Sequence, residues 1–142
     1  METVQQVLDK KGHEVWSIHP RHSVFDAIKK MGEKNIGSLV VLVDDQIVGI
    51  LTERDYARHV ILEGRSSLET PVRDIMTTRV VCARVGQRIE ECMAVMTEKR
   101  IRHLPVVDQQ RLTGLVSIGD LVKGIIADRK FAIEELIHYI QG

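Results

Sequence analysis

The chain has 142 residues, of which 44% are apolar, and its 20 basic residues balance its 20 acidic residues. This length suits one compact unit or two small units, and the balanced charge gives no general attraction to nucleic acid or anionic membrane. No apolar run approaches the roughly 18 residues that span a membrane, and the polar N-terminus is unlike a signal peptide. We therefore expect a cytoplasmic protein in which Cys82 and Cys92 are free thiols.

Residues 1–14 are expected to be an N-terminal helical segment, because "TVQQVLDK" suits a short helix. Residues 15–64 predict a β-α-β-β-α unit with strands at 15–18, 39–43 and 47–51. Its first helix begins at Ser23, where Ser23 and Asp26 have capping-box spacing. Its second helix begins at Glu53 and ends at Gly64. Helical periodicity makes two sets of residues face the core: Val24, Ala27, Ile28 and Met31, then Tyr56, Ala57, Val60 and Ile61.

Residues 65–79 form a connector that contains Pro71, and residues 80–127 repeat the β-α-β-β-α pattern. Residues 128–142 are expected to form an amphipathic C-terminal helix that packs on the surface of the pair or on a partner chain. Its apolar face consists of Ile133, Leu136, Ile137 and Ile140.

An offset of 65 positions aligns the two units without a gap and places "GILTERD" (49–55) over "GLVSIGD" (114–120). Two copies are too few for a solenoid, in which every unit needs neighbours, so they are expected to close on each other by pseudo-twofold packing. The predicted fold class is α/β (α+β).

The repeated motif has two readings. Thr52 with Asp55, and Ser117 with Asp120, have the spacing of a capping box at a helix start. Alternatively, a helix N-terminus attracts phosphate, and a carboxylate at its mouth accepts hydrogen bonds from both hydroxyls of a ribose. On this second reading, the glycine three residues before the hydroxyl residue lets a flat group approach the strand.

The sequence resembles the CBS-domain family, whose paired domains form the Bateman module, through "NIGSLVVLVDDQIVGILTERDYA", "TPVRDIMT" and "KRIRHLPVVDQQRLTGLVSIGDLV". The resemblance implies tandem CBS repeats that sense an adenosine ligand, of the AMP, ADP, ATP or NAD class, or S-adenosylmethionine. Such pairs change conformation or partner binding and form disc-like homodimers. The regulated partner is not identified by the sequence. The alternative function is a protein-interaction scaffold that binds no ligand.

The resemblance also implies the binding residues. Asp55 with Thr52, and Asp120 with Ser117, would hold ribose or phosphate in two clefts between the repeats. The apolar walls would be Trp16, Ser17 and Ile18 for the Asp120 cleft, and Val81, Cys82 and Ala83 for the Asp55 cleft. The strand beside the second motif would contribute Arg102, His103, Leu104 and Pro105, and Gly119 lies within that motif. Gly37 and Ser38 replace the basic pair in the first copy, where Arg54 would compensate. We therefore expect the second cleft to prefer a phosphorylated ligand.

Other chemistries find little support in the sequence. No ordered partner for His103 or Cys82 is readable, so we expect no enzyme activity. His19 and His22 do not make a metal site, and no basic stripe with aromatic residues predicts nucleic-acid binding. Trp16 either anchors the core or lines the adenine slot. A homodimer is expected through helices at 53–62 and 118–126, whose available apolar residues are Tyr56, Val60, Leu121 and Ile125.

Overall fold

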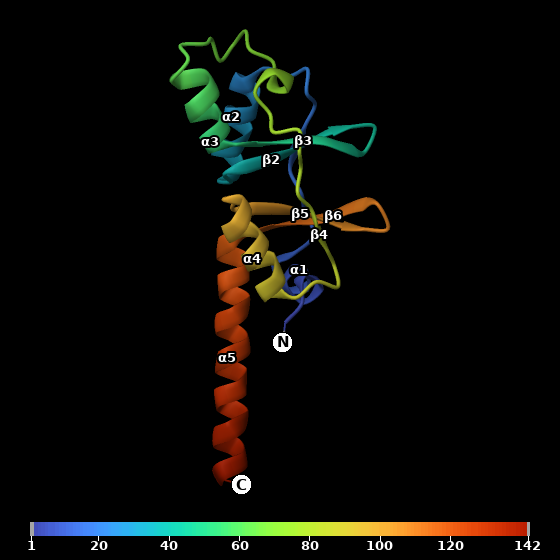
Figure 1. Ribbon diagram of the computed structural model, residues 1–142, viewed down its shortest axis with the longest axis vertical. Coiled ribbons are helices and arrows are strands. Elements are labelled where there is room, and N and C mark those ends of the chain that lie inside the picture. Colours follow the sequence, from blue (N-terminus) through green and yellow to red (C-terminus); the bar gives the residue numbers. More distant parts are fainter. Residues whose placement is uncertain (1, 142) are drawn as a thin grey trace. The chain divides into compact units, whose positions relative to one another are not determined.

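The computed structural model describes residues 2–141 and contains two compact units. Residues 15–81 form the first-repeat unit, and residues 2–14 together with 82–141 form the second-repeat unit. Each unit contains a three-stranded sheet in which the first short strand is parallel to the second, and the second is antiparallel to the third. The predicted α/β class and the repetition of the β-α-β-β-α unit are confirmed (Figure 1).

The first-repeat unit builds its core on α2 and the central strand. Its elements are β1 (Ser17–Ile18), α2 (Val24–Lys34), β2 (Ser38–Val43), β3 (Gln46–Thr52), α3 (Glu53–Tyr56), the π-helical turn η1 (Ala57–Ile61) and the 3₁₀ turn η2 (Val72–Asp74). Ser23 accepts a hydrogen bond from the Asp26 amide at 3.1 Å and so caps α2. Val24, Ala27 and Met31 are buried as expected, and Ile28 packs against the same core.

The predicted inward face of the next helix is partly wrong. Val60 is fully buried and Tyr56 packs on the core, but Ala57 and Ile61 are exposed. The reason is the π turn, in which the amide of Leu62 donates to the carbonyl of Ala57, five residues back. A π turn holds more residues than the 3.6 of an α-helix, so residues at helical spacing no longer share a face.

The second-repeat unit includes the start of the chain. Its elements are α1 (Val4–Lys11), β4 (Ala83–Arg84), α4 (Ile89–Lys99), β5 (His103–Asp108), β6 (Arg111–Ser117) and α5 (Ile118–Gln141). The amides of Val4 and Gln5 donate to the carbonyls of Gln87 and Val85, and Leu8 is fully buried. The N-terminal helix therefore belongs to the core of the second repeat, which the sequence did not predict.

Helix α5 runs without interruption for 24 residues, so the expected C-terminal helix is the continuation of the last helix of the repeat (Figure 1). Leu121 and Gly124 are its buried residues. The prediction that four apolar residues of the helices are available to a dimer partner is wrong for two of them. Val60 and Leu121 are both fully buried, so neither is available to contact a second copy.

Candidate functional site

The two copies of the motif form reciprocal caps at the helix that follows the third strand of each sheet. In the first copy, the Thr52 amide donates to Asp55 Oδ2 at 3.0 Å and the Asp55 amide donates to Thr52 Oγ1 at 3.1 Å. In the second copy, the Ser117 amide donates to Asp120 Oδ2 at 2.8 Å and the Asp120 amide donates to Ser117 Oγ at 3.1 Å. Both carboxylates are half-buried. The capping role predicted for the motif is therefore confirmed in both copies.

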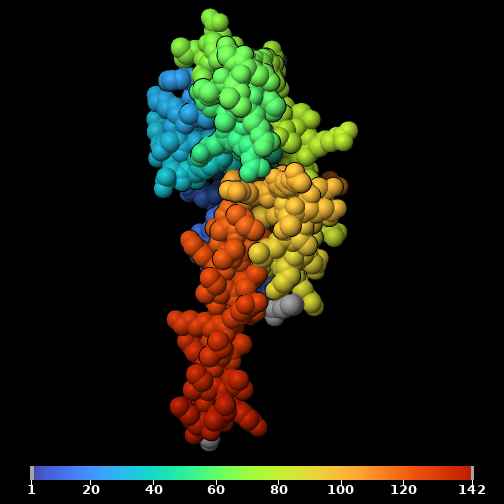
Figure 2. All heavy atoms as spheres, turned by 60° about the vertical axis from the view of Figure 1, so that its left-hand side comes forward, coloured from blue at the N-terminus to red at the C-terminus, as the bar shows by residue number. Residues whose placement is uncertain are grey.

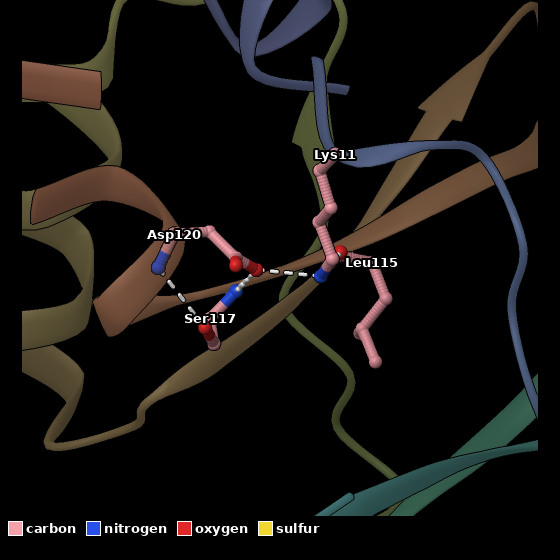
Figure 3. Close-up of polar contacts among 4 residues, drawn as sticks. All are labelled: Lys11, Leu115, Ser117 and Asp120. Atoms are coloured by element: carbon pink, nitrogen blue, oxygen red, sulfur yellow. Dashed lines mark hydrogen bonds and ion pairs between the residues drawn. The ribbon is translucent and has the colours of Figure 1, made fainter. Parts of the chain in front are cut away.

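Asp120 has a second partner that comes from α1. Lys11 Nζ lies 2.5 Å from Asp120 Oδ2 and 2.6 Å from the carbonyl oxygen of Leu115 (Figure 3). Burial alone would raise the pKa of Asp120, but the hydrogen bonds from Lys11 and Ser117 and the Lys11 charge outweigh burial and lower it. Asp120 is therefore ionised and paired with a cation at neutral pH.

Asp55 lies in a different environment. Its Oδ1 accepts a long hydrogen bond of 3.4 Å from the hydroxyl of Thr77. Two carboxylates at equivalent positions thus differ in their neighbours: one faces an ammonium group and the other a neutral hydroxyl group. Neither Lys11 nor Thr77 was predicted, because no local sequence pattern connects them to the motif.

The glycines of the two motifs have a different role from the one expected. A Cβ atom on Gly114 would lie 2.6 Å from Leu8 Cδ2, and a Cβ on Gly49 would lie 2.6 Å from Met76 Sδ and 3.0 Å from the Thr77 carbonyl oxygen. These glycines let α1 and the segment around Thr77 approach the sheet closely. The expectation that they admit a flat ligand is wrong, since the chain itself fills the space.

The basic positions of the second copy lie beside the motif. His103 is opposite Ser117 in the β5–β6 ladder, and the Arg102 carbonyl accepts the Ile118 amide at 2.9 Å. In the first copy, Ser38 is opposite Thr52, and Gly37 accepts the Glu53 amide at 3.1 Å.

The structure therefore brings the predicted basic pair next to the second motif and the small pair Gly37 and Ser38 next to the first. Leu104 and Pro105 are buried within β5. Gly119 and Arg54 are exposed on the first turns of α5 and α3.

The predicted wall residues occupy the first strands and their approaches. Ile18 is buried in β1, and the half-buried Trp16 packs on the core with Lys34 Nζ 4.2 Å from its ring centroid. Lys30 donates to the carbonyl of Ser17 at 2.5 Å. These residues lie in the first-repeat unit, whereas Asp120 lies in the other, so their meeting around one ligand stays a prediction.

The wall predicted for Asp55 is divided between the units, because Val81 ends the first-repeat unit and Cys82 begins the last part of the second. Ala83 is buried and Cys82 is exposed. Part of the Cys82 side chain is still covered by the protein, and this desolvation raises the pKa of its thiol. Within residues 2–141 there is no cluster of three His, Cys, Asp or Glu side chains that could hold a metal ion. No helix in that range is long and apolar enough to cross a membrane.

Comparison with known proteins defines the class. The family model described as "CBS domain" matches residues 4–62 and 72–127, so the chain belongs to the CBS domain family. The chain is 40% identical over 125 residues to the CBS domain-containing protein CBSX3, mitochondrial, of Arabidopsis thaliana. That match covers 84% of the chain but only 61% of the plant protein.

Two solved structures show the same fold. A protein with CBS domains from Burkholderia ambifaria MC40-6 is 52% identical, with a TM-score of 0.86 over 89% of this chain and 96% of that one. A CBS domain pair crystallised with 5′-methylthioadenosine and S-adenosyl-L-methionine is 23% identical, with a TM-score of 0.79 over 90% of this chain and 98% of that one. At that identity, the second likeness establishes the fold alone.

Proposed function

We propose that the chain is a regulatory module that binds an adenosine nucleotide, of the AMP, ADP, ATP or NAD class, at Asp55 and Asp120. The observation that carries the proposal is the repeated placement of a half-buried carboxylate beside a hydroxyl residue at a helix start. The crystallised relative with two adenosine ligands supports the proposal, because it shows that this fold can hold adenosine. Binding would change the conformation or the partner binding of the module.

The carboxylates would hold the ribose. The hydrogen bonds from Lys11 and from the Ser117 amide both end on Asp120 Oδ2, so Oδ1 is the oxygen that we assign to a ligand. A ribose hydroxyl can donate to that oxygen without breaking the cap. Asp55 would accept a ribose in the same way in exchange for its long bond to Thr77.

The second motif is better suited to a phosphorylated ligand. It opens α5, which has 24 residues, whereas the first motif opens an α-helix of only four residues. Helix α3 continues directly into the π turn at 57–61, so the first motif also opens a helical segment, but a much shorter one than α5. Lys11 neutralises Asp120, and Arg102 and His103 lie beside this motif. We expect AMP to bind there more tightly than adenosine.

The rival function is a scaffold that binds no nucleotide. It is favoured by the reciprocal hydrogen bonds with which protein groups form both caps. Thermal unfolding with AMP, NAD, S-adenosylmethionine and adenosine separates the two, because a ligand that binds the native state raises the melting temperature. A panel without any shift would refute nucleotide binding and leave the scaffold.

Calorimetry then assigns the site. Asp120→Asn keeps a capping acceptor but loses charge-assisted bonds to ribose, so AMP affinity should fall by roughly tenfold to a few hundredfold. Asp55→Asn should act in the same way on whatever fills the first site. An unchanged affinity in both variants would show that the motif only caps its helix.

A further inference from the structure

Helix α5 carries a row of exposed apolar side chains along one face. Five side chains define the α5 stripe and are between 40% and 74% exposed: Val122, Ile126, Ile133, Leu136 and Ile140. The last turns of the helix extend well past the β4–β6 sheet and stand clear of other side chains (Figures 1 and 2). Single exposed apolar residues are ordinary, but five of them along one face of a helix indicate an interaction surface.

The stripe has the spacing of a helix that pairs with another helix. Its members follow one another at intervals of 4, 7, 3 and 4 residues, which are the intervals of a heptad seam interrupted once. The interruption falls at Arg129, which occupies the missing position. The stripe covers 18 residue steps, or about 27 Å of helix.

We propose that the α5 stripe is covered by the α5 stripe of a second copy of this chain, in antiparallel orientation. With Ile126 opposite Leu136 of the second copy, Val122 meets Ile140 and Ile133 meets the aliphatic stem of Arg129. Every apolar member of the stripe then faces an apolar surface. The proposal does not depend on nucleotide binding, and its test can fail while that function stands.

The order of charges along α5 selects the antiparallel partner. Arg129 and Lys130 precede the middle of the seam and Glu134 and Glu135 follow it. Antiparallel pairing brings Lys130 within about one helical turn of Glu134 of the second copy, on the same side of the seam. Parallel pairing would instead place Arg129 against Arg129 of the second copy at a seam position, where like charges repel.

The same charges disfavour a lipid surface as the occupant. Helices that lie on membranes carry a polar face rich in lysine and arginine. Residues 128–135 carry Asp128, Glu134 and Glu135 against Arg129 and Lys130, so this segment is slightly acidic.

Sedimentation velocity on the full chain tests the proposal. We expect a monomer–dimer equilibrium with a dissociation constant on the order of 10 µM, because the seam is small among stable interfaces. Ile133→Glu should weaken the dimer by roughly tenfold or more. Phe131→Glu is the matched control, since Phe131 is 62% exposed on the opposite face of the same helix; it should leave the equilibrium unchanged. A wild-type monomer at 200 µM, or equal effects of the two variants, would overturn the proposal.

Two mixing experiments test the pairing itself. Lys130→Glu and Glu134→Lys proteins should each dimerise poorly alone and recover when mixed in equal amounts. On a Cys82→Ser background, Ile126→Cys and Leu136→Cys proteins should form interchain disulfides faster when mixed than either forms alone. Faster formation of disulfides between two copies of the Ile126→Cys protein than in the mixture would contradict the antiparallel orientation. A monomer in solution that binds phosphatidylserine vesicles through Ile133 would show a lipid surface as the occupant instead.

Discussion

Lys11 and Asp120 are 109 positions apart in the chain, and their side chains form an ion pair of 2.5 Å that joins the end of α1 to the start of α5. Asp55, at the equivalent position of the first repeat, accepts a hydrogen bond from the neutral hydroxyl group of Thr77 in addition to its capping bond from the Thr52 amide. The two capping carboxylates therefore have different tertiary partners, a lysine ammonium group at Asp120 and a threonine hydroxyl group at Asp55.

The first prediction concerns Lys11→Met, which removes the cation and keeps the side-chain stem. We expect the free energy of unfolding to fall by about 1 kcal/mol at pH 7, a modest value because the lysine is partly exposed. The pKa of Asp120 is lower in the folded than in the unfolded chain. Its ionised form therefore stabilises the fold above the unfolded pKa of about 4, and this stabilisation disappears as pH falls through the folded pKa.

Urea unfolding of wild type and variant at pH 7, 5 and 3 measures this dependence. The difference between them should be complete at pH 7 and small at pH 3. Lys123→Met serves as the control, since Lys123 is an exposed residue of the same unit and its loss changes the net charge equally. An equal destabilisation by Lys11→Met at all three pH values would mean that packing of the stem, and not the ion pair, is lost.

A second prediction compares Asp120→Asn with Asp55→Asn in the absence of nucleotide. Each variant keeps a capping acceptor, so the loss of capping should be about 1 kcal/mol or less in both. Asp120→Asn also leaves Lys11 without its counter-charge and should cost about 1 kcal/mol more. Chemical denaturation of the two variants measures the difference, and equal losses would refute the asymmetry between the motifs.

A third prediction concerns Gly114→Ala. The new methyl group would collide with the fully buried Leu8, so the second-repeat unit should lose about 1–3 kcal/mol of stability. The double variant Leu8→Ala with Gly114→Ala should lose less than the sum of the single variants, since the smaller side chain makes room. Strict additivity in this cycle would show that α1 does not pack on β6 at that glycine.

The fourth prediction uses the two thiols. Burial raises the pKa of Cys82, and burial and Glu91 raise that of Cys92, so iodoacetamide should react slowly at pH 7 and faster as pH rises. Cys82 should react first because it is exposed and Cys92 is buried. Saturating AMP or NAD should slow the reaction at Cys82 alone if that residue lines the first nucleotide site. Mass spectrometry of the labelled peptides measures the reaction at each cysteine. Equal labelling of Cys82 with and without nucleotide would show that Cys82 does not line the site.

Local patterns predicted the parts of the structure that depend on neighbouring residues. The reciprocal caps at Thr52 and Ser117 and the buried stripe of α2 follow from spacings of three or four residues. The partners of the capping carboxylates did not follow, because Lys11 and Thr77 reach them through tertiary packing. The π turn also escaped prediction, since residues 57–61 have an ordinary helical pattern and the extra residue per turn is a property of the packed unit.

The second-repeat unit is built from both ends of the chain, with the whole first repeat between its parts. During synthesis the first-repeat unit is complete when residue 81 has been made, and domains generally fold as units in that order. Helix α1 leaves the ribosome before the first repeat, yet Gly114, on which Leu8 packs, is made more than 100 residues later. Helix α1 can therefore pack only after the second repeat has been made, and a nascent chain stopped after the first repeat carries it unpacked.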